Sequence, residues 1–588
     1  MLSLLVGCGG AEDGSGGRSA AVESPTRQPG AQQPESQPRP GGPDGEGAAS
    51  REPGGVPGAG ARPNIVLIVA DDLGYSDLGA FGGEIPTPNI DALARDGMML
   101  TQFYSSLACS PTRSMLFSGT DNHVAGLGVM GPPQDPKLRG QPGYEAHLNF
   151  RVASLASLMR DAGYRTYMTG KWHLGRDVET GPAARGFDRS FVSLDGAAHL
   201  GGLSWNGPGL APYRDGEELV TVGEDFYSTR FYTQRMIEYI ESDRGGAAAA
   251  ERAAGSGGAE DDAPFFAYLA YTAPHWPLQA PRESIAKFEG WYDEGYEALY
   301  RRRLERAKEL GLVPADFEGI PPVDGQPSWE ELTDEERRFA ARRMEIYAAM
   351  VSDLDAYVGR FVDYLEEIGE LDDTFIFFMS DNGPESSRRE LVPPVSRWVE
   401  TCCDNSYENL GAGDSYVMYG PNWARAGSAP FRRWKATAFE GGIHVPAFAR
   451  FPGVVPEGGR NDAFATVMDL LPTFLALAGA EHPGETYRGR PVAPVRGESL
   501  LPMLSGRAQD AHDEEYYVGW ELYGHRAVRQ GNWKIVWDPT EREAAAWHLF
   551  DLSRDPGEQS DLAAAEPERL ERMLELWERY RRDSGVIL

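Results

Sequence analysis

The sequence predicts an α/β protein with a large, mixed and mostly parallel sheet flanked by helices. Three continuous apolar runs are typical of strands buried on both faces of such a sheet: Asn64 to Ala70, Pro264 to Tyr271 and Thr374 to Met379. Amphipathic segments lie between these runs, as expected of helices that cover the sheet. At 588 residues the chain is long enough for one large α/β domain and a smaller unit.

The first 61 residues predict a disordered tether. Residues 1–61 are rich in Gly, Pro, Ser, Gln and Glu, so they cannot bury enough apolar surface to offset the entropy of ordering. Leu5-Val6-Gly7-Cys8 resembles a bacterial lipobox and predicts a lipid anchor at Cys8. The apolar stretch is short and no positive region precedes it. Either the chain starts further upstream, which we favour, or the match is accidental. A working signal implies a periplasmic or cell-surface protein, and otherwise a cytoplasmic one.

Oxygen ligands follow two of the buried strands. Asp71 and Asp72 directly follow the first strand, and Asp381 and Asn382 follow the strand that ends at Met379. Ligands of open α/β sheets bind at the carboxyl ends of the strands. Three carboxylates and one amide suit Ca²⁺ or Mg²⁺ better than zinc. For the first pair, an N-cap beside a solvated carboxylate is the alternative.

Cys109 lies where a helix is predicted to begin. Met99 to Ser105 predicts a second strand, and Pro111 suits the first turn of the helix after it. The N–H groups and the macrodipole at a helix N-terminus attract anions. Arg113 lies one turn further on the same face, where its guanidinium can bind the same anion. A small buried hydrophobic Cys is the alternative.

Further basic side chains follow predicted strands. The strand from Tyr164 to Thr169 runs into Lys171 and His173, which alternate by two and should point to one side of an extended chain. His275 follows another strand, between prolines that fix its backbone. Lys435 precedes a predicted strand from His444 to Phe451. A solvated Lys and a satisfied polar His are the alternatives.

The rest of the chain predicts helices, loops and a C-terminal unit. Residues 242–263 have the low complexity of a surface insertion, and 384–430 predicts a long polar loop. A ring between the neighbours Cys402 and Cys403 would be strained, so we expect two loop thiols rather than a redox or metal pair. A composition shift near residue 480 predicts a second unit, 481–588. The helices are predicted over Val152 to Ala162, Phe226 to Glu241, Phe339 to Ile368, Asp469 to Gly479 and Glu566 to Arg582, and short strands over Ala527 to Trp537 and Trp547 to Leu552.

Cys109-Ser110-Pro111-Thr112-Arg113 matches C-x-P-x-R, the signature of the type I, formylglycine-dependent sulfatases. The resemblance spans about residues 62–588 and includes Gly-Lys-Trp-His, Ala-Pro-His-Trp-Pro and Ser-Asp-Asn-Gly; two segments look especially like bacterial arylsulfatases. It implies an alkaline-phosphatase-like fold with a smaller C-terminal antiparallel sheet and helix. It also implies a catalytic domain over 62–480 and hydrolysis of a small sulfate ester, most simply an aryl sulfate.

Site roles follow from the same resemblance. A formylglycine-generating enzyme would convert Cys109 to Cα-formylglycine, whose hydrate attacks sulfur and forms a covalent sulfo-enzyme before inorganic sulfate leaves. The cation would be Ca²⁺, with Mg²⁺ as the alternative, on Asp71, Asp72, Cys109, Asp381 and Asn382. The catalytic residues would be Cys109, Arg113, Lys171, His173, His275, Asp381 and Lys435.

Charge and the complete site limit the alternatives. A formal net charge of −33 argues against nucleic acid as a partner, and it repels a sulfated substrate at long range. The site must therefore supply local positive potential. C-x-P-x-R alone does not show that the substrate is a sulfate ester, so a formylglycine-dependent phosphonate monoester or phosphodiester hydrolase remains an alternative. Alkyl and glycan sulfates remain alternatives to an aryl sulfate as the substrate. A non-catalytic tethered binding protein should have lost site residues, and none is missing. We expect a monomer.

Overall fold

The computed structural model describes residues 62–194, 196, 198–204, 209–245, 263–541 and 546–588. The predicted tether with Cys8 lies outside these residues, as does most of the predicted insertion; residues 242–245 belong to a helix. Within the described part of the chain, no helix is both long and apolar enough to cross a membrane.

The core of the molecule is a ten-stranded mixed sheet in the order β11-β2-β10-β9-β1-β8-β4-β5-β6-β7. Its five central strands run parallel, and β10, β6 and β7 run antiparallel to their neighbours. This confirms the predicted mixed, mostly parallel sheet. The strands are β1 (Asn64–Ala70), β2 (Met98–Leu100), β4 (Arg165–Lys171), β5 (Arg189–Ser193), β6 (Tyr213–Asp215), β7 (Glu218–Val220), β8 (Phe265–Ala270), β9 (Thr374–Ser380), β10 (Ala447–Arg450) and β11 (Gly459–Asn461).

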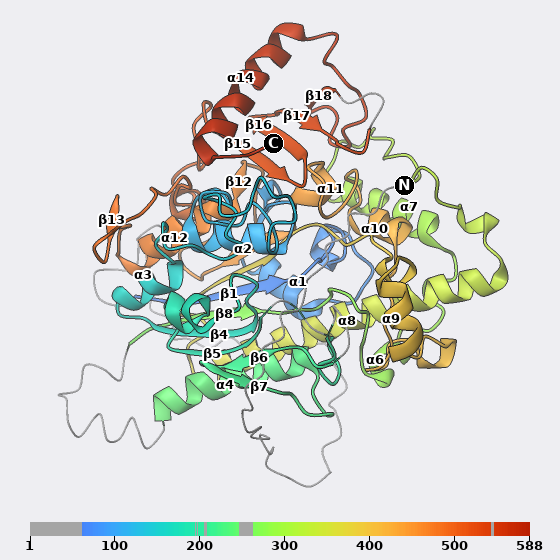
Figure 1. Cartoon of the computed structure of the whole chain (residues 1–588), viewed down its shortest axis with the longest axis horizontal. Coiled ribbons are helices and arrows are strands. Elements are labelled where there is room, and N and C mark those ends of the chain that lie inside the picture. Colours follow the sequence, from blue (N-terminus) through green and yellow to red (C-terminus); the bar gives the residue numbers. More distant parts are fainter. Residues whose placement is uncertain (1–61, 195, 197, 205–208, 246–262, 542–545) are drawn as a thin grey trace, which may run out of the picture.

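Helices cover both faces of the sheet (Figure 1). In β1, Val66 and Ile68 contribute to one hydrophobic core, and Ile65 and Leu67 contribute to the other. This two-sided burial explains why the strand is apolar throughout. The first core includes α1 (Pro88–Arg95), α4 (Ser228–Gly245), α7 (Tyr296–Glu309) and α8 (Asp334–Glu367). The second includes α2 (Cys109–Ser118), α3 (Leu155–Asp161), α12 (Leu470–Ala478) and α13 (Leu501–Leu504).

The remaining helices are short. They are α6 (Arg282–Ala286), α9 (Val395–Cys402), α10 (Pro421–Gly427), α11 (Glu440–Ile443) and the 3₁₀ turns η1 (Gly79–Phe81), η2 (Val178–Thr180), η3 (Ala183–Arg185), η4 (Trp329–Glu331), η5 (Arg389–Leu391), η6 (Tyr407–Asn409) and η7 (Val467–Asp469). Two-stranded ladders join β3 (Phe103–Tyr104) to β12 (Ala465–Thr466), and β13 (Thr486–Tyr487) to β14 (Arg490–Pro491).

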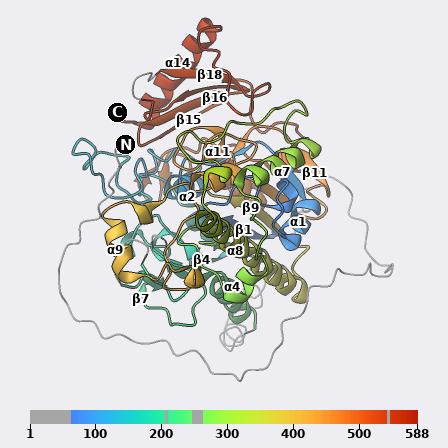
Figure 2. The same cartoon turned by 90° about the vertical axis from the view of Figure 1, so that its right-hand side faces the viewer.

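The C-terminal unit is a four-stranded antiparallel sheet with a closing helix, as the resemblance implied. It comprises β15 (Tyr517–Leu522), β16 (His525–Gln530), β17 (Trp533–Trp537), β18 (Trp547–Asp551) and α14 (Pro567–Ser584). One face of the sheet joins the second core, and Val528, Ile535 and Leu549 on the other face pack against α14. Figure 2 shows this unit at one end of the molecule.

Three local predictions are wrong. The strand predicted over Met99 to Ser105 is two strands, β2 and β3, which belong to different sheets. The predicted polar loop over 384–430 contains α9 and α10, whose short apolar faces are hard to separate from a loop pattern. Cys402 and Cys403 are not two thiols but form a disulfide. Cys402 ends α9 and Cys403 leaves it in an extended conformation, so the two sulfurs do not keep a helical offset.

Candidate active site

The site forms where neighbouring parallel strands end. Asp71 follows β1, Asp381 follows β9 and Lys171 ends β4, and these strands lie close together in the sheet. His275 follows β8, which separates β1 from β4. Because parallel strands deliver their carboxyl ends to one edge, residues up to about 300 positions apart in sequence meet here.

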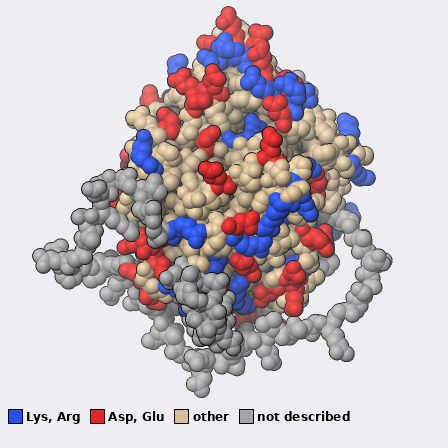
Figure 3. Space-filling view, turned by 90° about the vertical axis from the view of Figure 1, so that its left-hand side faces the viewer, with Lys and Arg blue, Asp and Glu red and all other residues tan. Residues whose placement is uncertain are grey.

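Two lysines neutralise two buried carboxylates. Lys171 Nζ donates to both carboxylate oxygens of Asp71, at 3.0 and 2.7 Å. Lys435 Nζ donates to Asp72 Oδ1 at 2.6 Å. Burial alone would lower the pKa of each lysine, but Asp71 raises that of Lys171, and Asp72 raises that of Lys435 well above its ordinary value. Both lysines therefore stay ammonium ions. On the face shown in Figure 3, exposed acidic and basic side chains are interspersed. Inside the site, the buried ammonium groups of both lysines supply positive potential.

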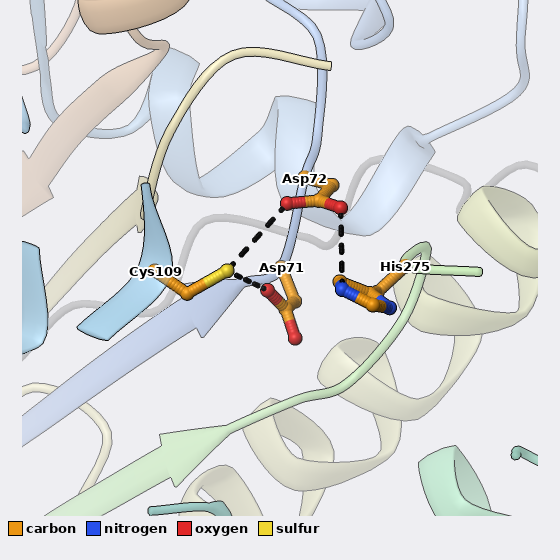
Figure 4. Close-up of side chains that lie close together, drawn as sticks. All are labelled: Asp71, Asp72, Cys109 and His275. Atoms are coloured by element: carbon orange, nitrogen blue, oxygen red, sulfur yellow. Dashed lines mark hydrogen bonds and ion pairs between the residues drawn. The ribbon is translucent and has the colours of Figure 1, made fainter. Parts of the chain in front are cut away.

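Cys109 is the first residue of α2, as predicted, and it points at the paired carboxylates (Figure 4). Its Sγ lies 3.2 Å from Asp71 Oδ1 and 3.8 Å from Asp72 Oδ1. Burial, and then the charges of Asp381 and Asp71, raise the pKa of the thiol well above its ordinary value. A thiol that stays protonated is a poor nucleophile. The helix N-terminus therefore does not activate Cys109 as a thiolate.

Arg113 holds Asp381. Its Nε and Nη2 donate to Asp381 Oδ2 at 3.0 and 2.7 Å, and its Nη1 donates to the Lys171 carbonyl at 2.9 Å and to the Tyr268 hydroxyl at 3.2 Å. The guanidinium is fully buried. In this structure its contacts are thus with a predicted metal ligand and the strand ends.

The two histidines occupy different positions. His275 Nδ1 donates to the Trp276 carbonyl at 2.5 Å, so its Nε2 faces Asp72 Oδ2 at 3.5 Å. His173 has φ 55°, so the backbone is not extended at this residue, and the alternation of Lys171 and His173 stays a prediction. Its Nδ1 is buried and has no hydrogen-bond partner among the described residues. Burial, and then Lys171, lower the pKa of His173; burial lowers that of His275 against the opposing charge of Asp71.

The residues fit a hard cation. Ligand atoms of Asp71, Asp72, Cys109 and His275 lie within 4.8 Å of one another. Within the described chain, Asp72 Oδ2 and Asn382 Oδ1 are buried and accept no hydrogen bond. Burial, and then the nearby charges of Asp71, Glu385 and Asp381, raise the pKa of Asp72 to about 7 against the effect of Lys435. A cation would satisfy these two oxygens and would favour the ionised form of Asp72.

The predicted ligand set and this geometric group differ at three residues: Asp381, Asn382 and His275. Asp381 was predicted as a ligand, and its Oδ2 is bonded to Arg113, while Oδ1 accepts from the Asp72 amide at 3.2 Å. His275, predicted as an acid, lies among the four clustered side chains. Asn382 belongs beside them, because its Nδ2 donates to Asp72 Oδ1 at 2.7 Å.

Sequence reasoning missed three residues that support the site. Glu385 lies 3.7 Å from Lys435, and its position four residues after Asp381 was the available signal. His199 Nε2 donates to the His275 carbonyl at 2.7 Å, and Tyr268 contacts Arg113. For these two no sequence pattern gave a signal, because one lies in a loop and the other inside a buried strand.

Comparison with known proteins identifies the family. A sulfatase family model matches residues 63–480, and a model of the N-sulphoglucosamine sulphohydrolase C-terminal region matches residues 433–582. An uncharacterized sulfatase of Schizosaccharomyces pombe is 45% identical over 90% of this chain and 94% of its own length. The arylsulfatase of Klebsiella aerogenes is 38% identical over 77% of this chain and 94% of its own length.

A solved structure supports the same fold. Ps i-CgsB in complex with k-i-k-neocarrahexaose aligns with a TM-score of 0.60 at 24% identity, over 89% of this chain and 94% of that one. The fold is alkaline-phosphatase-like, as the sequence resemblance implied. The chain therefore belongs to the sulfatase family, and its relatives support sulfate ester hydrolysis as its activity.

Proposed function

We propose that the protein hydrolyses sulfate monoesters, with aryl sulfates as the preferred class, after Cys109 has been converted to Cα-formylglycine. The observation that carries the proposal is the setting of Cys109. Its side chain is buried and points at Asp71 and Asp72, with Lys171 and Lys435 beside them. Burial and the charges of Asp381 and Asp71 raise the pKa of the thiol, so a hydroxyl-bearing replacement suits this position better than a thiolate does. The arylsulfatase of Klebsiella aerogenes supports the aryl preference.

The modification and the cation would each supply one element of the chemistry. The hydrated aldehyde at residue 109 supplies one hydroxyl that attacks sulfur and a second hydroxyl for release of sulfate. Asp71, Asp72, Asp381 and Asn382 would hold Ca²⁺, or Mg²⁺, which supplies positive charge to the sulfate oxygens.

The remaining residues bind the sulfate group and move protons. Lys171 and Lys435 are buried ammonium ions, and such fixed charges stabilise developing negative charge most in a water-poor site. His275 carries a proton on Nδ1, because that atom donates to a carbonyl, so Nε2 is the atom that can give a proton to the leaving oxygen. The Lys435 ammonium acts with His275 as a proton donor in this step. A bound sulfate brings negative charge to the ring and favours its protonated form. His173, with an unpartnered Nδ1 in the described structure, is the acceptor for the second hydroxyl proton.

The test is a substrate panel on enzyme produced with a formylglycine-generating enzyme. Nitrophenyl sulfate, an alkyl sulfate and a sugar sulfate are compared with nitrophenyl phosphate and a phosphonate monoester. We expect the highest kcat/KM on nitrophenyl sulfate and none above background for Cys109→Ala. A higher kcat/KM on the phosphonate would establish the alternative hydrolase, and a preference for the sugar sulfate would replace the aryl class. Full activity of protein in which Cys109 is unmodified and can still be alkylated would refute formylglycine at residue 109 as the nucleophile.

A further inference from the structure

Glu385 is a half-buried carboxylate directly beside the proposed proton donors, and the proposed chemistry does not use it. It lies in the segment after β9, three residues beyond Asn382, and its side chain is 18% exposed. Oε1 accepts from the Ser387 amide at 2.8 Å, which fixes the carboxylate to its own loop. Oε2 lies 3.7 Å from Lys435 Nζ and accepts from Trp276 Nε1 at 3.4 Å. One oxygen therefore contacts two other segments of the chain.

Both of those segments carry a proposed proton donor. Lys435 Nζ lies between Glu385 and Asp72, with the shorter contact, 2.6 Å, to Asp72. The Trp276 carbonyl accepts the Nδ1 proton of His275, so the position of Trp276 determines where the imidazole points. Glu385, Trp276 and Asp72 also line the same small cavity, which shows that this carboxylate faces the site.

We propose that Glu385 is a positioning residue for leaving-group protonation, an inference that rests on the proposed function. Glu385 gives the Lys435 ammonium a second anionic neighbour besides Asp72, and its hydrogen bond to the indole holds the Trp276 segment against which His275 is oriented. Without Glu385, Asp72 is the one remaining carboxylate in contact with Lys435 among the described residues, so the ammonium is held by that predicted metal ligand alone. The leaving oxygen then loses its nearby proton donors, while sulfate binding is retained.

The expected signature is selective loss with basic leaving groups. A nitrophenolate leaves readily without a proton, but an alkoxide does not. In matured enzyme, Glu385→Gln should lower kcat on an alkyl sulfate by roughly 10–100-fold and on nitrophenyl sulfate by about 3-fold or less, with KM little changed on either. Glu385→Asp keeps the charge and should restore most of the alkyl sulfate activity. The matched control is Glu390→Gln, because Glu390 is a buried carboxylate of the same loop that pairs with Arg388 instead. It should leave the ratio of the two rates at the wild-type value.

Three results would overturn the inference. Equal losses on both substrates for Glu385→Gln would show a general structural role, as would an altered ratio in Glu390→Gln. A wild-type ratio in Glu385→Gln would show that the contact has no part in protonation. These outcomes are distinct from failure of the proposed function, in which matured wild-type enzyme turns over neither sulfate ester.

Discussion

Among the clusters of buried charged side chains in the described structure, two differ in how their polar atoms are paired. The active-site cluster comprises Asp71, Asp72, Asp381, Asn382, Arg113, Lys171 and Lys435. The junction cluster lies between the main body and the C-terminal unit and comprises Asp121, His123, Glu440, Glu521, Lys534 and Glu558. Both are almost completely shielded from solvent.

The junction cluster pairs its charges across the two units. Lys534 Nζ on β17 lies 2.7 Å from Glu440 Oε1 and 2.8 Å from Glu558 Oε1. Glu558 Oε1 accepts no hydrogen bond within the described structure, but it still faces this ammonium ion. His123 bridges Asp121 at 3.1 Å and Glu521 at 3.0 Å. The Tyr580 hydroxyl of α14 donates to Asp121 at 2.9 Å. These contacts link the C-terminal sheet and its helix to the main body.

The active-site cluster contains buried polar atoms without a hydrogen-bond partner among the described residues. In the described structure, Asp72 Oδ2 and Asn382 Oδ1 accept no hydrogen bond, although an unsatisfied buried polar group costs about 1–3 kcal/mol. The paired strands β1 and β9 hold both residues in place. The unfavourable free energy of the two unbonded oxygens therefore falls at a position where a bound ligand can satisfy them. This difference indicates that the active-site cluster binds a ligand and that the junction cluster stabilises the contact between the main body and the C-terminal unit. Changes in the first should therefore affect activity, and changes in the second should affect stability.

The largest expected effect is the loss of residue 109. Cys109→Ala should reduce kcat by roughly 10⁴-fold or more, because the proposed nucleophile is absent. The free energy of unfolding should change by about 1 kcal/mol or less, since one sulfur atom is removed. Turnover of nitrophenyl sulfate and a urea melt measure the two quantities. Mass spectrometry of the wild-type peptide should show the aldehyde or its hydrate, and substantial turnover by the variant would contradict the assignment.

Removal of the cation should abolish activity as well, reversibly. After rigorous chelation we expect turnover to return with Ca²⁺ or Mg²⁺, and thermal stability to rise with the ion by about 2.7 kcal/mol at 100 times its Kd. The control is Asp72→Asn, which should weaken the ion-dependent shift in stability even when no substrate is present. Full activity in the chelated protein, or stoichiometric zinc by metal analysis, would contradict the assignment of a Ca²⁺ or Mg²⁺ site to the active-site cluster.

Lys534→Met should lower the stability of the protein and leave its activity nearly unchanged, the opposite of Cys109→Ala. Removing one partner of a buried ion pair costs about 3–5 kcal/mol, because Glu440 and Glu558 then face each other without a cation. The urea midpoint should fall, while kcat per folded molecule stays within about twofold of wild type. Adding Glu558→Gln should recover part of the stability, since one buried charge is gone. A large fall in kcat with little loss of stability would show that the junction acts on catalysis.

The smallest expected effect is a pH dependence of stability that comes from His123. Burial alone would lower its pKa, but hydrogen bonds to Asp121 and Glu521 raise it to about 9. Because the folded pKa lies above the unfolded value of about 6.5, the contribution is complete below that pH and is lost as pH rises to about 9. At about 1.4 kcal/mol per pKa unit, the loss amounts to a few kcal/mol.

The measurement is the difference between wild type and His123→Gln in free energy of unfolding from pH 6 to pH 9. The difference cancels other groups that titrate in this range, such as Glu558, whose pKa burial raises to about 7. The difference in free energy of unfolding between wild type and His123→Gln should shrink as pH rises. A difference that is constant across the range would mean that His123 is not charged in the folded protein.

The amino-acid sequence was enough to locate the central strands and to indicate the family. β1, β8 and β9 are apolar throughout because both faces are buried, so their ends, and therefore Asp71, Asp381 and Asn382, could be located from composition alone. The motif beginning at Cys109 indicated the family because it combines Cys109, Pro111 and Arg113 at fixed spacing.

Tertiary structure decided the contacts between these segments. Arg113 binds Asp381 across 268 positions, and Lys435 binds Asp72 across 363, and no local pattern carries such pairings. The same holds for Glu385 beside Trp276 and for Lys534 between two glutamates. α9 and the disulfide of Cys402 and Cys403 also escaped prediction, because a short helix depends on the surface it packs against. Periodicity encodes which face of a strand is buried. Which side chain neutralises a buried charge is fixed only when the strand ends meet.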